Sequence, residues 1–597
     1  MPDPTTPTLR FDLSGAPIPP ELSAALPAHL GLHHHAEGAR AGYTLDDVFL
    51  LTRSTVPAQR VLMLGILAGI VRRLAGMRRG PSSSSKGMEE LCGKEEEIRK
   101  RAIAAGAEAI SERGSLGSRA VEVLWEALVG WDEELMTVDG AELQDDPGGP
   151  PDQEGDSATR GDAISSLQLQ FFLPQITTIF DAADLPRLSL VQLLAILQRL
   201  AMHNNNVADE ITDTPSLIAN VFRVFILTPI PPSENSPLPN PAAIYLLTTL
   251  AAASRFSASR LLDPADALLR FLTSTPASSP YSLPLATNLL TQTLRLYTTF
   301  ARYGLYSHIA TTAAEPLAHL SSYVLSPECD SRPLSTAYAS LLAAWTTCAS
   351  DPHQTTPPHD ILWSQVCGWG WISDLAAIAH KLTQDASDWG AWAALWNAEA
   401  AWLEGARHNC VRGGAGERET SLSRLRPGFD SGMEKEVVSG AISSLKRLLS
   451  EIPTGYDASR GLVFYREIAE SALVLSAAIR LWLACLPMEY EPLPEPPFQL
   501  PFPLPIHRQI TINFQLHPHH PVLPRAQIHP LKGHKLPDRL RHTAHPPQQI
   551  NLCHITPLHI PNILHLNLKR YRITNPKRLI STTTPGPEPA RGERRVR

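Results

Sequence analysis

The sequence predicts an all-α protein, an irregular α-solenoid of HEAT- or armadillo-like helical hairpins with an irregular N-terminal motif and a disordered C-terminal tail. From about residue 165 onward, apolar residues recur at helical spacing, and period-two strand patterns are nearly absent. A capping side chain followed by proline recurs at Thr214, Asn240 and Asp263. These positions imply a helix pair about every 49 residues, near the roughly 40–47 of known helical repeats.

Composition restricts the function classes. The 597 residues carry a net charge of −7, yet residues 501–597 hold 15 Lys and Arg against three Asp and Glu. The body is therefore acidic, which argues against a direct nucleic-acid surface. Seven cysteines without a CxxC pair indicate reduced thiols, and the longest apolar run, Val61 to Val71, is shorter than the roughly twenty residues of a membrane span. We expect a soluble intracellular protein that contacts no membrane.

The first segment, residues 1–80, begins irregularly and then becomes helical. Thr44 is the predicted N-cap of a helix, with Asp47 three residues on as an acidic variant of the capping box, and Tyr43 and Val48 in the positions of a hydrophobic staple. A second helix is predicted from about Pro57 to the cationic run before Gly80. The serine-rich stretch that follows reads as a linker.

Residues 88–136 alternate charged and apolar positions at helical spacing and predict a helical hairpin. The chain then becomes strongly acidic, with eleven acids and one arginine between Asp132 and Asp162. Such a composition cannot bury enough apolar area to offset ordering, so 137–163 is predicted to be a disordered linker.

Residues 164–490 are predicted to form the helical repeat domain. One face is formed by Leu190, Leu193, Leu194, Leu197, Leu200 and Ala201, and another by Ile218, Val221, Phe222 and Phe225. Eight of the eleven tryptophans lie between 345 and 402, where Trp389, Trp392, Trp396 and Trp402 trace roughly one helix face. We interpret this stripe as core between packed helices, the alternative being a groove for a partner helix or peptide.

Residues 491–597 form a Pro- and His-rich basic tail without stable periodicity, holding 11 of the 22 histidines from residue 501 on. Disorder and a gene-modelling artefact, such as an unspliced intron or a shifted frame, are the two preferred interpretations. A metal-binding role for these histidines is the lesser alternative.

No motif in the chain predicts an active site: HExxH, a strand-linked GxGxxG, a P-loop and GxSxG are all missing. The run His33-His34-His35 is a poor zinc site, because adjacent residues of an extended chain point to opposite sides and no cysteine or carboxylate cluster accompanies them except Glu37. It also lacks the nucleophile or orienting acid that a general base needs. We interpret it as a recognition loop fixed against the helix that Thr44 begins.

Several blocks near the N-terminus resemble the C-terminal signature domain of the RNA polymerase II-associated protein 1 family. They are Arg10-Phe11-Asp12 with Gly15, Gly31-Leu32-His33-His34-His35 with Glu37, Ala41-Gly42-Tyr43-Thr44, and Leu51-Thr52-Arg53-Ser54. The signature covers about 65 residues, and Ala36 replaces the family's usual glycine. The helical remainder is similar to the region that follows the signature in fungal members. A separate motif that precedes the signature in the family is missing here, so functions belonging to it are not carried over.

The resemblance implies a non-enzymatic factor without cofactor or metal, which binds RNA polymerase II subunits and polymerase assembly or import factors in nucleus and cytoplasm. Its expected roles are polymerase assembly, nuclear import and coupling to regulators. The predicted partner-binding residues are Arg10, Phe11, Asp12, Gly15, Gly31, Leu32, His33, His34, His35, Glu37, Gly42, Tyr43, Thr44, Arg53 and Ser54. Two alternatives remain: a general helical-repeat transport or scaffold adaptor, and a His-dependent metal hydrolase. In a further alternative, Phe11, Leu13 and Tyr43 only pin the loop to the first helices.

Overall fold

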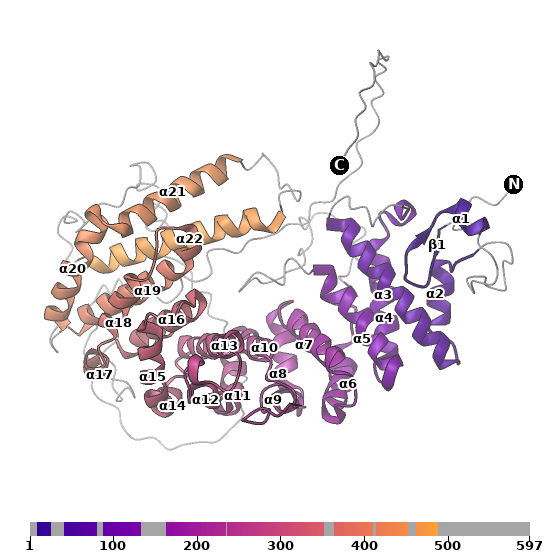
Figure 1. The fold of residues 1–597 in the computed structure, drawn as a ribbon, viewed down its shortest axis with the longest axis horizontal. Coiled ribbons are helices and arrows are strands. Elements are labelled where there is room, and N and C mark those ends of the chain that lie inside the picture. Colours follow the sequence, from indigo (N-terminus) through magenta and orange to yellow (C-terminus); the bar gives the residue numbers. More distant parts are fainter. Residues whose placement is uncertain are drawn as a thin grey trace, which may run out of the picture.

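The computed structural model describes residues 9–25, 41–79, 87–132, 163–234, 236–350, 363–409, 414–451 and 461–486. Helices dominate these residues, and the strands named there are β1 (Arg10–Phe11) and β2 (Pro17–Ile18), which pair antiparallel. The all-α prediction is confirmed. The helices follow one another along an elongated arc from the N-terminal hairpin to α22 (Figure 1).

The elements before the acidic segment are short at first and then longer. After the two strands come α1 (Pro20–Ala25), α2 (Leu45–Leu51), α3 (Pro57–Arg79), η4 (Glu89–Leu91), α4 (Glu95–Ala109), α5 (Gly114–Leu128) and η5 (Gly130–Asp132). The helices at Thr44 and Pro57 lie where the sequence predicts them.

The elements after the acidic segment are helices of varied length. They are α6 (Leu169–Ala182), α7 (Arg187–Ala201), α8 (Asn205–Asp213), α9 (Leu217–Phe225), α10 (Pro241–Ala253), α11 (Arg255–Ala265), η8 (Asp266–Leu268), α12 (Leu269–Leu272), η9 (Pro276–Ser278), α13 (Leu283–Arg302), α14 (Ser307–Thr312), α15 (Ala314–Leu325), α16 (Arg332–Ala349), α17 (Trp363–Gly368), α18 (Trp371–Ala379), η10 (Ala386–Asp388), α19 (Trp389–His408), α20 (Gly414–Ser431), α21 (Met433–Glu451) and α22 (Gly461–Cys485).

One row of helices runs through the whole array. Each member contacts the next, in the order α3, α5, α7, α10, α13, α16, α19 and α22. A second layer covers this row, with contacts that include α6 on α9, α8 on α11, α12 on α15, α15 on α18 and α20 on α21. Members of the row between α7 and α19 begin at intervals from 42 to 57 residues, so the repeat is irregular, as predicted.

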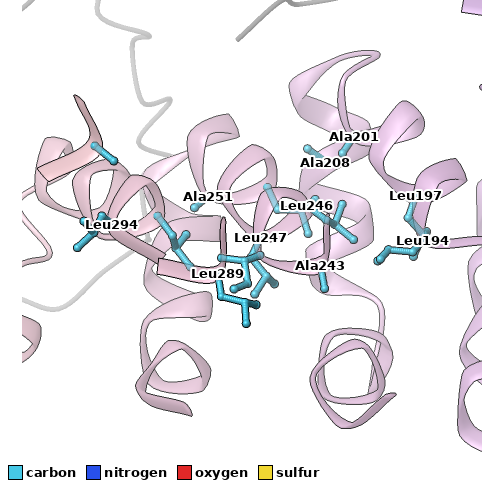
Figure 2. Close-up of a cluster of buried hydrophobic side chains, with 14 of the residues drawn as sticks. Leu194, Leu197, Ala201, Ala208, Ala243, Leu246, Leu247, Ala251, Leu289 and Leu294 are labelled. Carbon is cyan, nitrogen blue, oxygen red and sulfur yellow. The ribbon is translucent and has the colours of Figure 1, made fainter. Parts of the chain in front are cut away.

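The core lies between successive members of the row. Figure 2 shows it around α10, where Leu246 and Leu247 lie among Leu194 and Leu197 of α7, Ala208 of α8 and Leu289 of α13. All six residues predicted to form the α7 face are buried, as are Val221, Phe222 and Phe225 of the α9 face. The apolar periodicity therefore identified the packed faces of both helices correctly.

The tryptophan stripe is core. Trp389, Trp392, Trp396 and Trp402 of α19 are at most 6% exposed, and α19 packs between α16 and α22. The Trp392 and Trp396 ring centroids lie 5.4 Å apart, and Trp396 lies 5.5 Å from Phe429 of α20. These four rings therefore do not line a groove for a partner.

Of the three predicted capping positions before proline, one is confirmed. Asn240 accepts a hydrogen bond from the backbone N–H of Ala242 and begins α10 at Pro241. Thr214 instead ends α8, where its hydroxyl donates to the Glu210 carbonyl, and α9 begins after Ser216. The prediction at Asp263 is also wrong, because Ser254 caps α11 and Pro264 lies inside that helix. The 49-residue interval therefore rested on two positions that begin no helix.

Asp132, the first residue of the acidic stretch, lies before the predicted linker and belongs to the core. Its side chain is only 2% exposed and accepts hydrogen bonds from Arg99 of α4 and Arg199 of α7. Two buried guanidinium groups compensate the carboxylate, which is why an acidic residue is tolerated in the interior. Of the predicted linker 137–163 only Ala163 is described, and it is buried. The tail 491–597 lies outside the described residues, and the domain boundaries stay predictions.

One segment of α22, Arg466–Cys485, is long and apolar enough to span a membrane by length and composition. Its residues Val474, Ala478 and Leu481 are buried, and α22 packs on α19 and α21. A core helix of a helical array has the same composition, so this segment is weak evidence for a span.

Cysteine reactivity provides a first prediction. Burial raises the pKa of Cys348 and of Cys485 to about 12, and the Cys348 thiol donates to the Ala301 carbonyl. Cys92 is exposed. Because the thiolate is the nucleophile, iodoacetamide at neutral pH should alkylate Cys92 and leave Cys348 and Cys485 unmodified. Peptide mass mapping before and after denaturation checks this, and rapid labelling of Cys348 in the native protein would contradict it.

Candidate functional site

The hairpin at the N-terminus is built around Asp12. Its Oδ1 accepts hydrogen bonds from the Ser14 N–H and the Ala16 N–H, both at 2.8 Å, and from the Ser14 hydroxyl at 2.7 Å. Gly15 has a φ of 73°, a conformation that favours glycine. The carboxylate and the glycine together fix the turn between β1 and β2.

This turn lies directly on α3. A Cβ atom on Gly15 would come within 2.6 Å of the Ile66 carbonyl oxygen, and one on Gly69 would overlap the Ser14 carbonyl oxygen. The Arg73 guanidinium donates to the Gly15 carbonyl oxygen at 3.1 Å. Two glycines thus allow the hairpin and the helix to meet backbone to backbone.

The segment Ala41–Thr44 completes the module. Phe11 and Tyr43 exchange backbone hydrogen bonds of 2.9 and 3.0 Å, and the Arg10 guanidinium donates to the Gly42 carbonyl at 3.0 Å. Gly42 has a φ of 96°, and a Cβ there would lie 2.8 Å from Cδ1 of Ile18. Arg10 and Phe11 are both buried, so they hold this segment in place.

Ser23 and Ala41 lie on either side of residues 26–40, which are outside the described residues, and are hydrogen-bonded to each other. The Ala41 N–H donates to the Ser23 carbonyl at 2.9 Å, and the Ser23 hydroxyl donates to the Ala41 carbonyl at 2.6 Å. The predicted residues Gly31, Leu32, His33, His34, His35 and Glu37 all lie between them, outside the described residues. The two flanks of the segment that holds the histidine run are therefore joined to each other.

Thr44 caps α2 as predicted. Its Oγ1 accepts from the Asp47 N–H at 3.1 Å, and its own N–H donates to the Asp47 carboxylate at 3.1 Å, which is a complete capping box. Val48 is buried and Tyr43 is half-buried, so the helix start is set against the core.

Arg53 is an exposed charged member of the predicted set. Its side chain is 68% exposed and forms an ion pair with Glu108 of α4 at 3.0 Å. A parallel pair joins Arg60 of α3 to Glu112, also at 3.0 Å. Ser54 accepts the Val56 N–H and donates to the Gln59 carboxamide, so it organises the turn into α3.

An arginine of α3 forms ion pairs with two acidic residues of α5. Arg72 donates to Glu126 at 2.6 Å and lies 3.3 Å from Glu122. The hydrogen bond that Arg72 donates to Glu126 is the main reason that the pKa of Arg72 is raised. Among the described residues, no three His, Cys, Asp or Glu side chains are grouped as a metal site would require.

Residues 8–75, which include the hairpin, α1, α2 and most of α3, match the family model described as RPAP1-like, C-terminal. RNA polymerase II-associated protein 1 of Bos taurus is 28% identical over 415 residues, and that of Homo sapiens is 31% identical over 331 residues. RNA polymerase II-associated protein RBA50 of Saccharomyces cerevisiae is 39% identical over 66 residues. The N-terminal module is therefore similar to the C-terminal domain of the RNA polymerase II-associated protein 1 family.

The family likeness is unevenly distributed along the chain. The bovine and human proteins align with 60% and 49% of this chain, but the chain spans only 29% and 24% of their lengths. The RBA50 match covers 11% of the chain and 15% of the relative. Among solved structures, yeast importin-β (Kap95p) aligns with 74% of this chain at a TM-score of 0.30 and 10% identity, and we draw nothing from it.

Several residues that build the module were missed by sequence reasoning. Gly69 and Arg73 of α3 and Ser23 of α1 contact the hairpin or anchor the histidine segment, although none belongs to the quoted family blocks. The signal for Gly69 was available, since a glycine inside a long apolar helix commonly marks a close approach. Nothing local to Ser23 indicates that its hydroxyl reaches Ala41.

Proposed function

We propose that this chain is a non-enzymatic factor that binds RNA polymerase II, supports its assembly and nuclear import, and couples it to regulators. The observation that carries the proposal is the match of the N-terminal module to a family whose members are named as associated with the polymerase. Action in both nucleus and cytoplasm follows from an import role. The acidic body favours protein partners over direct contact with nucleic acid.

We propose that Arg53 and the residues from Gly31 to Glu37 form the docking surface for the polymerase, and that His33, His34 and His35 contribute most of the contact. Two features support this assignment: the hydrogen bonds between Ser23 and Ala41 anchor the segment, and Arg53 has an exposed side chain. Arg10 and Phe11 are buried and hold the segment Ala41–Thr44, so we do not place them in the docking surface.

The central experiment replaces the three histidines. We expect that His33→Ala, His34→Ala and His35→Ala together abolish co-purification of RNA polymerase II from cells, because interface energy concentrates in a few side chains. The far-UV circular dichroism of the purified variant should equal that of the wild type. The matched control replaces His519 and His520 of the tail with alanine, and this variant should retain the polymerase.

Three results would count against the proposal. Retention of polymerase by the triple variant would reject the histidine surface while leaving polymerase binding intact. Absence of polymerase from the wild-type purification would reject the function itself. Stoichiometric zinc that survives chelation of the untagged protein, together with hydrolysis lost in the triple variant, would favour a metal hydrolase.

A further inference from the structure

A surface remote from the N-terminal module combines exposed apolar side chains with unpaired positive charge. It is formed by the start of α7, the loop between α9 and α10, and the connection from α12 to α13. Leu188, Leu227, Ile230 and Leu238 are each between 45% and 70% exposed there. Scattered exposed aliphatic residues are ordinary, but contiguous ones mark interaction surfaces.

Two arginines hold the α9–α10 loop from opposite sides. The Arg187 guanidinium donates to the Val224 carbonyl at 3.0 Å and to the Leu238 carbonyl at 3.2 Å, so it joins both ends of the loop to α7. The Arg270 guanidinium donates to the Thr228 carbonyl at 2.6 Å and joins the loop to α12. A hydrogen bond of 2.8 Å from the Asn240 N–H to the Phe225 carbonyl closes the loop. These contacts hold the loop that carries Leu227, Ile230 and Leu238 against α7, which carries Leu188, and against α12.

Neither arginine is neutralised. Carbonyl groups and aromatic rings are the partners of Arg187 and Arg270, and neither forms an ion pair with a carboxylate among the described residues. Desolvation by burial lowers the pKa of the Arg187 guanidinium, as expected for a charge held without a counterion. Two positive charges without countercharges therefore lie within an apolar surface.

A pocket of about 200 Å³ opens between Ile230, Arg270, Phe271, Tyr281, Leu289 and Leu290. This volume is below the roughly 300–1,000 Å³ of small-molecule sites and fits one bulky side chain. Tyr281 is 9% exposed, and its hydroxyl has no hydrogen-bond partner among the described residues. The Thr228 hydroxyl is also buried and has no hydrogen-bond partner among the described residues. Thr228 is the residue whose carbonyl accepts the hydrogen bond from Arg270. Both hydroxyl oxygens are almost fully shielded from solvent, so neither is counted as a contact for a ligand.

We propose that this surface, here called the Ile230 pocket surface, binds a short peptide segment of a partner protein that carries one bulky apolar side chain flanked by acidic residues. The apolar side chain enters the pocket, and the carboxylates pair with Arg270 and Arg187. Charge complementarity selects this occupant over a basic or uncharged segment. The chain's own acidic residues 137–163 are poorer in bulky apolar side chains, with Leu143 as the largest.

The first test selects a ligand without assuming one. A phage-displayed random-peptide library is panned on the full chain, and the enriched peptides are synthesised with a fluorescein label. We expect a consensus of one aromatic or large aliphatic residue flanked by Asp or Glu, with binding that weakens as salt is raised. Enrichment of basic peptides, or failure to enrich any sequence, would overturn the proposal.

The second test maps the selected peptide by fluorescence polarisation. Ile230→Asp should weaken binding about tenfold or more, as loss of an anchor contact does. Its matched control is Leu449→Asp on α21, which makes the same change at a similarly exposed leucine and should bind like the wild type. Arg270→Met, which keeps the apolar stem, should lose affinity and most of the salt dependence. Equal binding by wild type and Ile230→Asp would overturn the proposal.

The outcome is separable from the polymerase-binding proposal. Ile230→Asp should still co-purify RNA polymerase II, because the substitution lies outside the N-terminal module. If the peptide binds only after the acids of 137–163 have been replaced by their amides, the chain's own segment occupies the surface and the partner assignment is wrong.

Discussion

Asp132→Asn should destabilise the array by about 3–5 kcal/mol, which is the usual cost of removing one partner from a buried ion pair. Arg99 is fully buried and Arg199 is 2% exposed, and both donate to the same carboxylate oxygen of Asp132, at 2.9 to 3.2 Å. The amide would leave two buried guanidinium groups without a countercharge between them. The partly exposed Glu96, which also pairs with Arg99 at 3.2 Å, cannot neutralise both.

The position of this cluster explains why the effect should spread. Arg99 lies on α4, Asp132 on η5 and Arg199 on α7, so three elements from both sides of the acidic segment share one charge. Arg99 also donates to the Ala127 carbonyl at the end of α5. Hydrogen exchange should therefore accelerate in α4, α5 and α7 together, because the contacts among these elements open as one unit.

A second aspartate-to-asparagine variant tests whether the loss of stability depends on the burial of the ion pair. Asp46→Asn also breaks an arginine pair, with Arg101 at 3.3 Å, but the Asp46 side chain is 73% exposed. Its melting temperature should equal that of the wild type, since exposed pairs contribute little. Adding Arg199→Met to Asp132→Asn should recover part of the loss. Wild-type exchange rates in Asp132→Asn would show that the cluster does not hold these helices together.

The sequence predicted the helical class and the buried faces because both depend on local periodicity. The apolar spacing of α7 and the capping box at Thr44 are encoded within a few turns of chain. The charged core residue Asp132 could not be found in this way. Its partners lie 33 and 67 residues away, and an acidic residue beside a run of acids has the local pattern of a solvated loop.

The capping predictions show the same limit. Asn240, Thr214 and Asp263 share one local pattern, yet only Asn240 begins a helix. At α11 the start is decided by Asp209, which accepts hydrogen bonds from the Ser254 and Ser257 hydroxyls across 45 and 48 residues. Tertiary contacts therefore overrode an equivalent local signal.

Within the candidate site, the family blocks select the segment, and the structure adds which of its described residues are buried and which are exposed. Phe11 and Tyr43 were predicted to touch a partner, or alternatively to pin the loop. Their paired backbones and the full burial of Phe11 give them a structural role in the module. Arg53 remains a predicted contact residue with an exposed side chain. Burial and backbone pairing, which join residues 32 positions apart, distinguish these roles, and so they could not be predicted from the local sequence. A second long-range contact, between the hairpin and α3, holds the module together.

That contact leads to the second large effect. Gly69→Ala should destabilise the N-terminal module by about 1–3 kcal/mol, the usual cost of overpacking a close contact. The added methyl group would overlap the Ser14 carbonyl oxygen, and the neighbouring atoms are backbone, which cannot rotate away. Since the turn at Gly15 lies against the same helix, the hairpin must move off α3. Thermal unfolding followed by circular dichroism, with hydrogen exchange of residues 10–18, measures the loss.

Gly76→Ala is the matched control, because it makes the identical change two turns later in the same helix. Apart from its chain neighbours and the backbone of its own helix, no atom of the described residues lies within 4 Å of the position that its Cβ would occupy. Alanine is favoured over glycine in helices by about 0.5–1 kcal/mol, so this variant should be more stable than the wild type. If the hairpin positions the docking surface, Gly69→Ala should also lose RNA polymerase II, whereas Gly76→Ala should retain it. Equal stability of the two variants would mean that the hairpin does not rest on α3.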